Sequence, residues 1–364
     1  MKLKIKTSIL QGLLSKALKG MGGNKMVPIT TFIGIELKDN ILTLHTMDGT
    51  NYLDVKAGAK VEGEDFSLTL TSDQFPRLVS KTTSEYIELE VTENSLNFKG
   101  NGEYKIDIPM DEGEFIVFPK APEVTSDATC VEVQVTTIKK ILSTNSKSVA
   151  RSLEEPVYTG YFICDKVITT DSYVVCVNDI KVLDTKKLFT ETFLNLITLS
   201  DKETVKLYYT DGGQLWVDAD AVRVYGSVLE SPTGEDYVTR FPYDSVMAYV
   251  NENFGSMCKL PRASVDSILD RLSLFITPYD KNALNFRFTK DGLIISSKSS
   301  TGTEMVAYTE SKNFQDFECQ IDVETLKSQL SAQDSEVITM YYGHESAIKM
   351  VDGKLTQVVS LLEE

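Results

Sequence analysis

A pattern of apolar residues occurs three times along the chain at nearly equal intervals. Relative to a reference residue, the other apolar residues stand at −2, +5, +8 and +9, a spacing typical of a strand end that runs into an amphipathic helix. The reference residues are Ile5, Val133 and Leu260, so the steps between copies are 128 and 127 residues. Three copies at such regular steps predict a threefold internal repeat.

Each third of the chain also contains a second, similar segment. The segment around Leu70 has the whole pattern, the one around Ile321 lacks one position, and "KVLDTKKLFTETFL" matches poorly because Glu191 stands where an apolar residue is expected. Between these segments, alternating stretches joined by polar turns, such as 38–40, predict antiparallel hairpins. We therefore expect an α+β fold of three similar domains, each with two strand–helix half-repeats, antiparallel sheets outside and two helices on the inner face. The predicted boundaries are 1–124, 125–252 and 253–364.

Composition narrows the class of protein. The 364 residues are 42% hydrophobic and 25% charged, which is typical of a globular rather than a disordered chain. No apolar run has membrane-spanning length, and "MKLKIKTSIL" lacks the features of a signal peptide. The five cysteines are far apart, and we expect them to be buried small apolar residues in a reducing cytosol. A cytoplasmic location, in a bacterial cell or an infected one, is the expectation.

Charge is unevenly distributed between the predicted helices and the rest of the chain. The whole chain has a formal net charge of −16, yet the six predicted helix windows together carry a net charge of about +5. These windows are 7–20, 72–82, 136–151, 184–196, 261–272 and 322–334. Lysine on helix surfaces also serves helix propensity and solubility, so one basic helix alone is weak evidence. The alternative is that several helices form one basic surface that binds a polyanion such as DNA without reading its bases. The candidate basic residues of the first three windows are Lys16, Lys19, Arg77, Lys81, Lys139, Lys140, Lys147 and Arg151.

Sequence motifs for catalysis or metal binding are weak. The glycine loop 19–25 does not match a phosphate-binding P-loop, because Met26 follows Lys25 where Ser or Thr is required. His45 and His344 have no partner at ligand spacing, and no cysteine pair has zinc-site spacing. Asp218 and Asp220 are the candidates for Mg²⁺ ligands of a nuclease, although such pairs are more often solvated turn residues. We expect no cofactor, no bound metal and no catalytic residues.

Several segments resemble the bacterial-type sliding clamp, the β subunit of the replicative DNA polymerase. They are "GGNKMVPI" (22–29), "LTLHTMDGTNYLDV" (42–55), "VITTDSYVVCV" (167–177), "TRFPYDSVM" (239–247) and "TQVVSLLEE" (356–364), and their order and spacing cover the whole chain. The resemblance implies three similar domains per subunit and two subunits that close head-to-tail into a ring around duplex DNA. It also implies that the loop bearing Asn24 and Lys25 projects toward DNA.

The resemblance further implies an apolar groove that binds a short peptide of the polymerase, the clamp loader and other replication proteins. The matching positions are Tyr158, Thr170, Ser172, Tyr173, Val174, Val175, Pro242, Val246, Met247, Val358, Val359, Leu361 and Leu362. Most are apolar or aromatic, as a peptide-anchoring groove requires. From periodicity alone, Val174, Val175, Val358 and Val359 are ordinary strand residues. For the contact between subunits, the resemblance implies Tyr104 and the pair Leu274 and Phe275, although core packing after a helix is an equal alternative for that pair.

The chain also departs from the family pattern. Tyr173 and Val174 stand where many members have His-Arg, and Glu363 and Glu364 end the chain where a basic or apolar end is common. These departures predict a preference for partner peptides with basic flanks, and they are compatible with a virus-encoded clamp. The function expected is that of a non-enzymatic, homodimeric processivity factor. The alternatives are a Mg²⁺-dependent nucleotide or nuclease enzyme that uses Asp218 and Asp220, and a repetitive β-rich structural protein.

Overall fold

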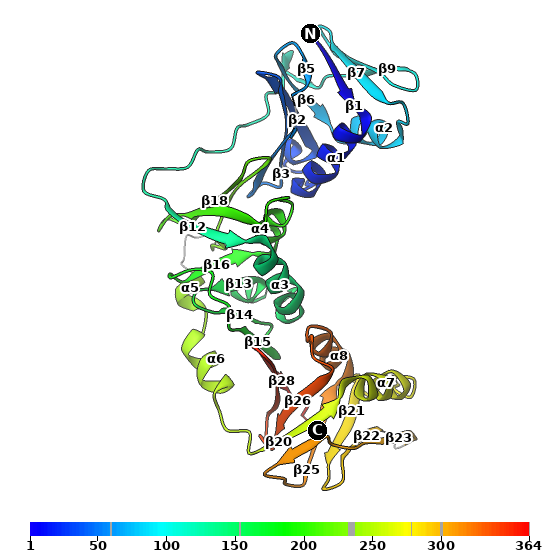
Figure 1. The fold of residues 1–364 in the computed structure, drawn as a ribbon, viewed down its shortest axis with the longest axis vertical. Helices are drawn as coiled ribbons and strands as arrows, with labels where there is room; N and C mark the ends of the chain where they lie inside the picture. The colour runs from blue at the N-terminus through cyan, green and yellow to red at the C-terminus, as the bar shows by residue number, and fades with distance from the viewer. Residues whose placement is uncertain (59, 153, 232–236, 278, 299–300, 364) are drawn as a thin grey trace. The chain divides into compact units, whose positions relative to one another are not determined.

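The computed structural model describes residues 1–58, 60–152, 154–231, 237–277, 279–298 and 301–363. They form two compact units, one from Met1–Ile138 with Thr192–Val228 and the other from Lys139–Glu191 with Leu229–Glu364. Each unit contains one long antiparallel sheet, a shorter sheet and several helices (Figure 1). The α+β class with antiparallel sheets is confirmed.

The first unit begins with the repeat pattern that the sequence predicts. Strand β1 (Lys2–Lys6) runs directly into α1 (Thr7–Ala17), which continues as a 3-10 turn over Leu18–Gly20. The half-repeat follows as β6 (Phe66–Thr71) and α2 (Phe75–Lys81), and α1 packs against α2 (Figure 1). The buried pattern positions of the first copy are Leu3, Ile5, Leu10, Leu13 and Leu14. The spacing therefore identifies residues that form a core, because positions one helical turn apart share one face.

Two sheets organise the first unit. The shorter one has the order β5-β1-β7-β8-β9, where the new strands are β5 (Glu62–Gly63), β7 (Tyr86–Val91), β8 (Ser95–Lys99) and β9 (Glu103–Asp107). The longer one has eight strands in the order β12-β17-β18-β19-β4-β3-β2-β6. Its other strands are β2 (Phe32–Lys38), β3 (Ile41–Met47), β4 (Tyr52–Lys56), β12 (Thr129–Gln134), β17 (Thr204–Tyr209), β18 (Gln214–Ala219) and β19 (Val222–Ser227). Strands of the first and middle thirds of the chain meet at the β4–β19 pairing, which we call the seam. A two-stranded hairpin, β10 (Met110–Asp111) and β11 (Glu114–Phe115), completes the unit.

The turn predicted at residues 38–40 joins β2 and β3 into a hairpin. Asp39 and Asn40 have φ values of 52° and 62°, and they are the two consecutive left-handed residues that a tight type I′ turn needs. Asp and Asn tolerate this conformation better than other residues with a Cβ atom. The sequence signal and the backbone geometry therefore agree at this turn.

The second unit is built around a nine-stranded sheet with the order β16-β13-β14-β15-β28-β27-β26-β20-β24. Its strands are β13 (Gly160–Ile163), β14 (Val167–Thr170), β15 (Val174–Asn178), β16 (Lys187–Thr190), β20 (Ser256–Pro261), β24 (Glu310–Lys312), β26 (Val337–Tyr342), β27 (Ala347–Asp352) and β28 (Leu355–Ser360). A four-stranded sheet, β23-β22-β21-β25, comprises β21 (Ala283–Phe288), β22 (Leu293–Ser297), β23 (Thr303–Val306) and β25 (Phe317–Asp322). The helices that lie entirely within the second unit are α5 (Tyr237–Arg240), α6 (Tyr243–Val250), α7 (Arg262–Ser273) and α8 (Val323–Ser331).

The eight-stranded sheet combines strands of the first and middle thirds of the chain, and the nine-stranded sheet combines strands of the middle and last thirds. The middle third therefore contributes to both units. Helix α3 (Val135–Asn145) begins in the first unit and ends in the second, and α4 (Glu191–Ile197) begins in the second and ends in the first. The division into domains at 124 and 252 stays a prediction, because the compact units follow the continuous sheets rather than the repeat of the sequence.

One predicted helix window is wrong in its first half. Residues 184–196 were expected to be helical, but β16 occupies Lys187–Thr190 and α4 begins only at Glu191. With Leu188 as its reference residue, five positions further along the chain, the repeat pattern lacks only its −2 position, which is Lys186. Its +5, +8 and +9 positions are then Phe193, Leu196 and Ile197, all buried. Leu188, rather than Leu183, is therefore the reference residue of this copy.

The cysteines are not all buried as expected. Cys130 is exposed, because it alternates with Val131 and Val133 along β12 and points to the solvent side of that strand. Cys319 is only partly buried, whereas Cys176 and Cys258 are buried. Burial raises the pKa of the Cys176 and Cys258 thiols to about 12, so these two groups stay protonated at neutral pH.

A carboxylate between two lysines lies on edge strand β24 and gives a testable pH dependence. Glu310 accepts from Lys259 Nζ at 2.5 Å and from Lys312 Nζ at 2.9 Å, and these contacts lower its pKa to about 2. Because the folded pKa lies below the unfolded value, the stabilisation is complete above about pH 4.5 and is lost as pH falls toward 2. We expect Glu310→Gln to be less stable than the parent at pH 6 and equally stable near pH 2, as measured by urea unfolding. A difference that stays constant over this range would contradict the prediction.

None of the helices in the described ranges is long and apolar enough to span a membrane.

Candidate functional site

The basic residues at the end of α1 divide into one paired and one free lysine. Lys16 Nζ lies 2.5 Å from Asp201 Oδ2, and both residues belong to the first unit. Lys19, in the following 3-10 turn, is exposed and has no ion pair among the described residues. On α2, Arg77 and Lys81 are four residues apart, exposed, and likewise without an ion pair in the described ranges. Sequence reasoning missed Asp201 because it lies 185 residues from Lys16.

The loop that carries Asn24 and Lys25 is exposed and held by its own hydrogen bonds. Asn24 Oδ1 accepts from the Met26 N–H at 2.9 Å, and the Asn24 N–H donates to Thr30 Oγ1 at 3.1 Å. Met26 is 91% exposed at the tip. At the base, a Cβ atom on Gly20 would lie 2.7 Å from Leu53 Cβ, so only glycine lets the chain leave the helix here. The loop presents Lys25 to solvent on a defined turn.

Helix α3 and the turn after it carry the four basic residues of the third window, all in the second unit. Lys139 and Lys147 are exposed and lack an ion pair within the described part of the chain. Lys140 pairs with Asp334, and Arg151 Nη1 donates to Glu191 Oε2 at 2.8 Å. Of the ten candidate residues for DNA binding, six are therefore exposed cations without an ion pair in the described ranges. They are Lys19, Lys25, Arg77, Lys81, Lys139 and Lys147.

A buried amide network connects the backbone at Lys147 with strand β28. Gln329, on α8, donates from Nε2 to the Lys147 carbonyl at 2.9 Å and accepts from Ser148 Oγ at 3.1 Å. Gln357, on β28, donates to Gln329 Oε1 at 2.8 Å and accepts from Gln333 Nε2 at 2.9 Å. All three glutamines are at least 96% buried, so each of these hydrogen bonds replaces a bond to water. The basic turn and strand β28 are thus held together through a fully desolvated polar core.

The predicted peptide groove divides between the two faces of the nine-stranded sheet. Val175 and Val358 are directly opposed in the β15–β28 pairing, and they pack in one apolar cluster with α6. Val174 and Val359 are the next opposed pair, and they belong to a different core cluster. Because successive strand residues point to opposite faces, these two pairs cannot line one surface. Val174 and Val359 are each 1% exposed, so for them the interpretation as strand core holds.

The face toward α6 brings together most of the remaining groove candidates. Partly buried Tyr158, Val175 and Met247 pack against a cluster that includes buried Val246 and Val358. Phe162 and Phe241 stack in the same cluster with ring centroids 4.5 Å apart. Pro242, half-buried, precedes α6, and buried Thr170 is opposed to Val175. This face offers a half-covered apolar surface on a rigid aromatic base, which suits an apolar peptide side chain.

Tyr173 lines a hollow of the second unit whose lining combines charged, polar and apolar side chains. Ser172 has a φ of 79°, and the Asp171 carboxylate accepts the N–H groups of Tyr173 and Val174 at 2.9 and 2.7 Å. This turn leaves the Tyr173 side chain 73% exposed. The half-buried Leu361 and Leu362 follow β28, and the Leu362 N–H donates to the Gln320 carbonyl of β25 at 2.9 Å. The lining residues that sequence reasoning missed include Glu318, Gln320, Glu345 and Ser346, which no local sequence signal marks.

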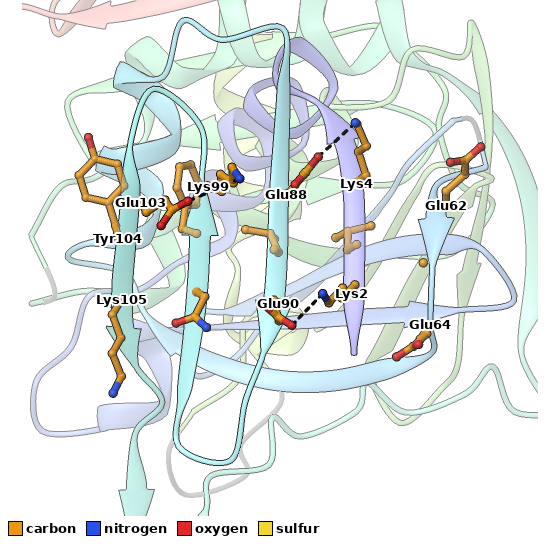
Figure 2. A pocket seen from close by; sticks show the side chains of 15 residues that line it. Lys2, Lys4, Glu62, Glu64, Glu88, Glu90, Lys99, Glu103, Tyr104 and Lys105 are labelled. Carbon is orange, nitrogen blue, oxygen red and sulfur yellow. Dashed lines mark ion pairs between the residues drawn. The ribbon is translucent and has the colours of Figure 1, made fainter.

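The candidates for a subunit contact are exposed: Tyr104 lies on an edge strand, whereas Leu274 and Phe275 directly follow α7. Tyr104 is 46% exposed on the edge strand β9, and the Lys2–Glu90 and Lys4–Glu88 ion pairs join β1 and β7 further along the same sheet (Figure 2). In the other unit, Leu274 is 82% and Phe275 46% exposed, so packing in the core does not account for them. Nearby, the edge strand β23 carries Met305, which is 57% exposed and which sequence reasoning missed. Both edges leave backbone groups of the strand without a neighbouring strand.

The carboxylates considered as Mg²⁺ ligands are engaged elsewhere. Asp218 Oδ2 lies 3.4 Å from Arg223 Nη2, and Asp220 Oδ2 lies 2.7 Å from Lys202 Nζ. The lysine beside Asp220 lowers the pKa of that carboxyl. Among the described residues, no group of three or more His, Cys, Asp or Glu side chains is arranged to hold a metal ion. The geometry gives the nuclease alternative no support.

The chain is similar in sequence to bacterial sliding clamps and in fold to DNA polymerase β subunits. The chain is 22% identical to the beta sliding clamp of Staphylococcus epidermidis over 359 residues, which covers 92% of this chain and 85% of the relative. The beta sliding clamp of Staphylococcus aureus is 22% identical over 312 residues, or 79% and 77% of the two chains. No family model matches the chain. The crystal structure of the beta subunit from DNA polymerase of Streptococcus pyogenes superposes with a TM-score of 0.85 at 14% identity and covers all of both chains. The chain has the DNA clamp fold.

The DNA clamp fold extends along the full length of the chain. The DNA polymerase sliding clamp from Bacillus subtilis, at 16% identity and a TM-score of 0.83, matches 100% of this chain and 99% of its own. The α+β class predicted from the apolar spacing and the DNA clamp fold implied by the resemblance are thereby confirmed. The roles of individual residues stay predictions, because a likeness at this identity concerns the fold.

Proposed function

We propose that this chain is the subunit of a ring-shaped DNA sliding clamp, a processivity factor that performs no reaction. Two subunits close head-to-tail around duplex DNA and tether the replicative polymerase and other replication proteins, after a clamp loader opens the ring. The tether raises the effective concentration of the enzyme at its template. The observation that carries the proposal is the likeness of the entire chain to polymerase β subunits, at a TM-score of 0.85. The cytoplasm of a bacterial cell, or of an infected one, is the proposed location.

Local features support the same function. Six exposed cations, which form no ion pair with another described residue, lie on α2 and α3 and in the turns after α1 and α3, in a chain whose net charge is −16. Such cations bind phosphates without reading sequence. The acidic remainder repels DNA from other surfaces, which favours threading through a ring over binding to its outside.

Retention on circular DNA tests the topology. The protein is loaded onto nicked circular DNA with its loader or in large excess, and half of the sample is then linearised. We expect retention on circles and rapid loss from linear ends, because a closed ring slides off an end but not off a circle. Equal loss from circular and linear DNA would show that the protein does not form a closed ring around DNA, whatever its affinity for DNA.

The partner groove gives a further prediction about peptide preference. We propose that a partner peptide inserts an apolar side chain beside Tyr158, Val175 and Met247 and runs past Tyr173 toward the acidic residues Glu345 and Glu363. A polymerase-derived peptide with lysine flanks is expected to bind more tightly than the same peptide with glutamate flanks, and salt is expected to reduce the difference. Fluorescence anisotropy at about 0.05 and 0.5 M NaCl measures both effects. Equal affinity of the two peptides would exclude electrostatic selection.

A further inference from the structure

One row of directly opposed residues crosses the solvent face of the eight-stranded sheet. Its members alternate in sign from the edge strand β12 to the seam and beyond it, where His45 ends the row. In spatial order they are Glu132, Lys206, Asp218, Arg223, Asp54 and His45. Directly opposed side chains in an antiparallel pair have Cβ atoms about 5 Å apart, so each of the four inner members faces opposite charge or a hydrogen-bonding partner on both sides.

The contacts in the row are closest around the seam. Arg223 Nη2 lies 3.4 Å from Asp218 Oδ2 on β18, and His45 Nδ1 lies 2.7 Å from Asp54 Oδ1 on β4. Arg223 and Asp54 are themselves opposed across the seam. The Asp54 and His45 side chains are only 21% and 16% exposed, so solvent screens their interaction less than that of a fully exposed pair.

The segment between β11 and β12 crosses the same face and covers the end of the row. Phe118 packs over Gly34, which is opposed to His45; a Cβ atom on Gly34 would lie 2.8 Å from Phe118 Cβ. The Phe118 and His45 rings stack at 6.3 Å. Four residues later, the Pro122 carbonyl accepts from Trp216 Nε1 on β18 at 3.0 Å. Since β2 and β18 lie on opposite sides of the seam, residues 118–122 bridge it.

We propose that the charge row and residues 118–122 form one latch that fixes the register of the seam and limits its local opening. The latch determines how rigidly strands of the first third are held to strands of the middle third. A shift of β19 by two residues would place Arg223 opposite Lys56 or Tyr52 instead of Asp54. Within β4 and β19, a two-residue shift would still oppose one buried apolar pair, either Val224 with Val55 or Val222 with Leu53, so these two strands alone discriminate only weakly against it. The inference does not depend on the proposed function.

Charge reversal and charge exchange distinguish a row from an isolated ion pair. Arg223→Asp and Asp54→Arg are each expected to increase hydrogen exchange of the β4 and β19 amides about 3- to 10-fold, as measured by mass spectrometry under conditions where exchange reports opening. The double variant is expected not to restore the parent rate, because it places Asp beside Asp218 and Arg beside His45. Restoration to the parent rate would mean an isolated pair, and unchanged rates in the single variants would mean no latch. Either result overturns the proposal.

The connecting segment provides its own matched pair of variants. Phe118→Ala is expected to increase exchange in β2, β3 and β4, whereas Val117→Ala is expected to have no effect, because the Val117 side chain is 81% exposed. Phe118→Leu retains an apolar contact over Gly34 and provides a milder change should the alanine variant not fold. Arg287→Asp, an exposed reversal on β21 in the other unit, controls for net charge. Equal exchange in the Phe118 and Val117 variants would remove the segment from the latch and overturn the proposal as stated.

Discussion

Replacing Lys19, Lys25, Lys139 and Lys147 together by glutamate is expected to lower DNA affinity at least about a hundredfold near 0.1 M salt. Each of these side chains is exposed and without an ion pair in the described ranges, so each is available to a phosphate. Every phosphate contact that is lost makes the slope of log affinity against log salt shallower by about 0.9. Titration of a fluorescent duplex at several salt concentrations measures the affinity and the slope.

A matched variant separates local contact from net charge. Lys38, Lys105, Lys290 and Lys354 are exposed lysines outside the helices and the turns that follow them, and their replacement by glutamate changes the net charge by the same amount. We expect this control to lower affinity modestly and to leave the salt slope nearly unchanged. Equal losses in the two variants would show that only the total charge matters, and the assignment of DNA contacts to these four lysines would then fail.

Truncation of Gln329 is expected to destabilise the second unit by about 3 kcal/mol or more. Gln329→Ala removes the side-chain partner of the Lys147 carbonyl and of Ser148 Oγ, and one of the two acceptors of the Gln357 amide, which keeps its bond to the Gln329 carbonyl, all in a buried region. Each buried polar group left without a hydrogen bond costs about 1–3 kcal/mol. Urea unfolding measures the free energy, and hydrogen exchange of α8 and β28 locates the loss in case the two units unfold separately.

Two further variants test whether unsatisfied polar groups cause that loss. Ser331→Ala alters an exposed position of the same helix and is expected to change stability by less than about 0.5 kcal/mol. The triple variant with methionine at 329, 333 and 357 removes the polar side chains together, and it is expected to be more stable than Gln329→Ala. A triple variant less stable than Gln329→Ala would indicate that the glutamine side chains contribute more than mutual satisfaction.

The site was only partly predictable from sequence. The basic windows identified Lys19, Lys139 and Lys147 as exposed, but periodicity carries no information on which lysines find a carboxylate. Lys16 and Lys140 pair with Asp201 and Asp334, which are 185 and 194 residues away. The peptide-groove candidates were chosen by resemblance, and strand alternation then placed Val174 and Val359 on the other face from Val175 and Val358.

The sequence by itself determined the α+β class and the strand–helix units, because the spacing of apolar residues encodes which local face is buried. Leu3, Ile5, Leu10, Leu13 and Leu14 needed no partner elsewhere to predict a strand followed by a helix. Tertiary structure alone decided that each long sheet is continuous between strands from two different thirds of the chain. The pairing of Arg223 with Asp54 and of Cys176 with Gln357 joins strands more than 160 residues apart. Such pairings depend on backbone hydrogen bonds that every residue except proline can make, so register is settled only when the faces of whole sheets are buried together.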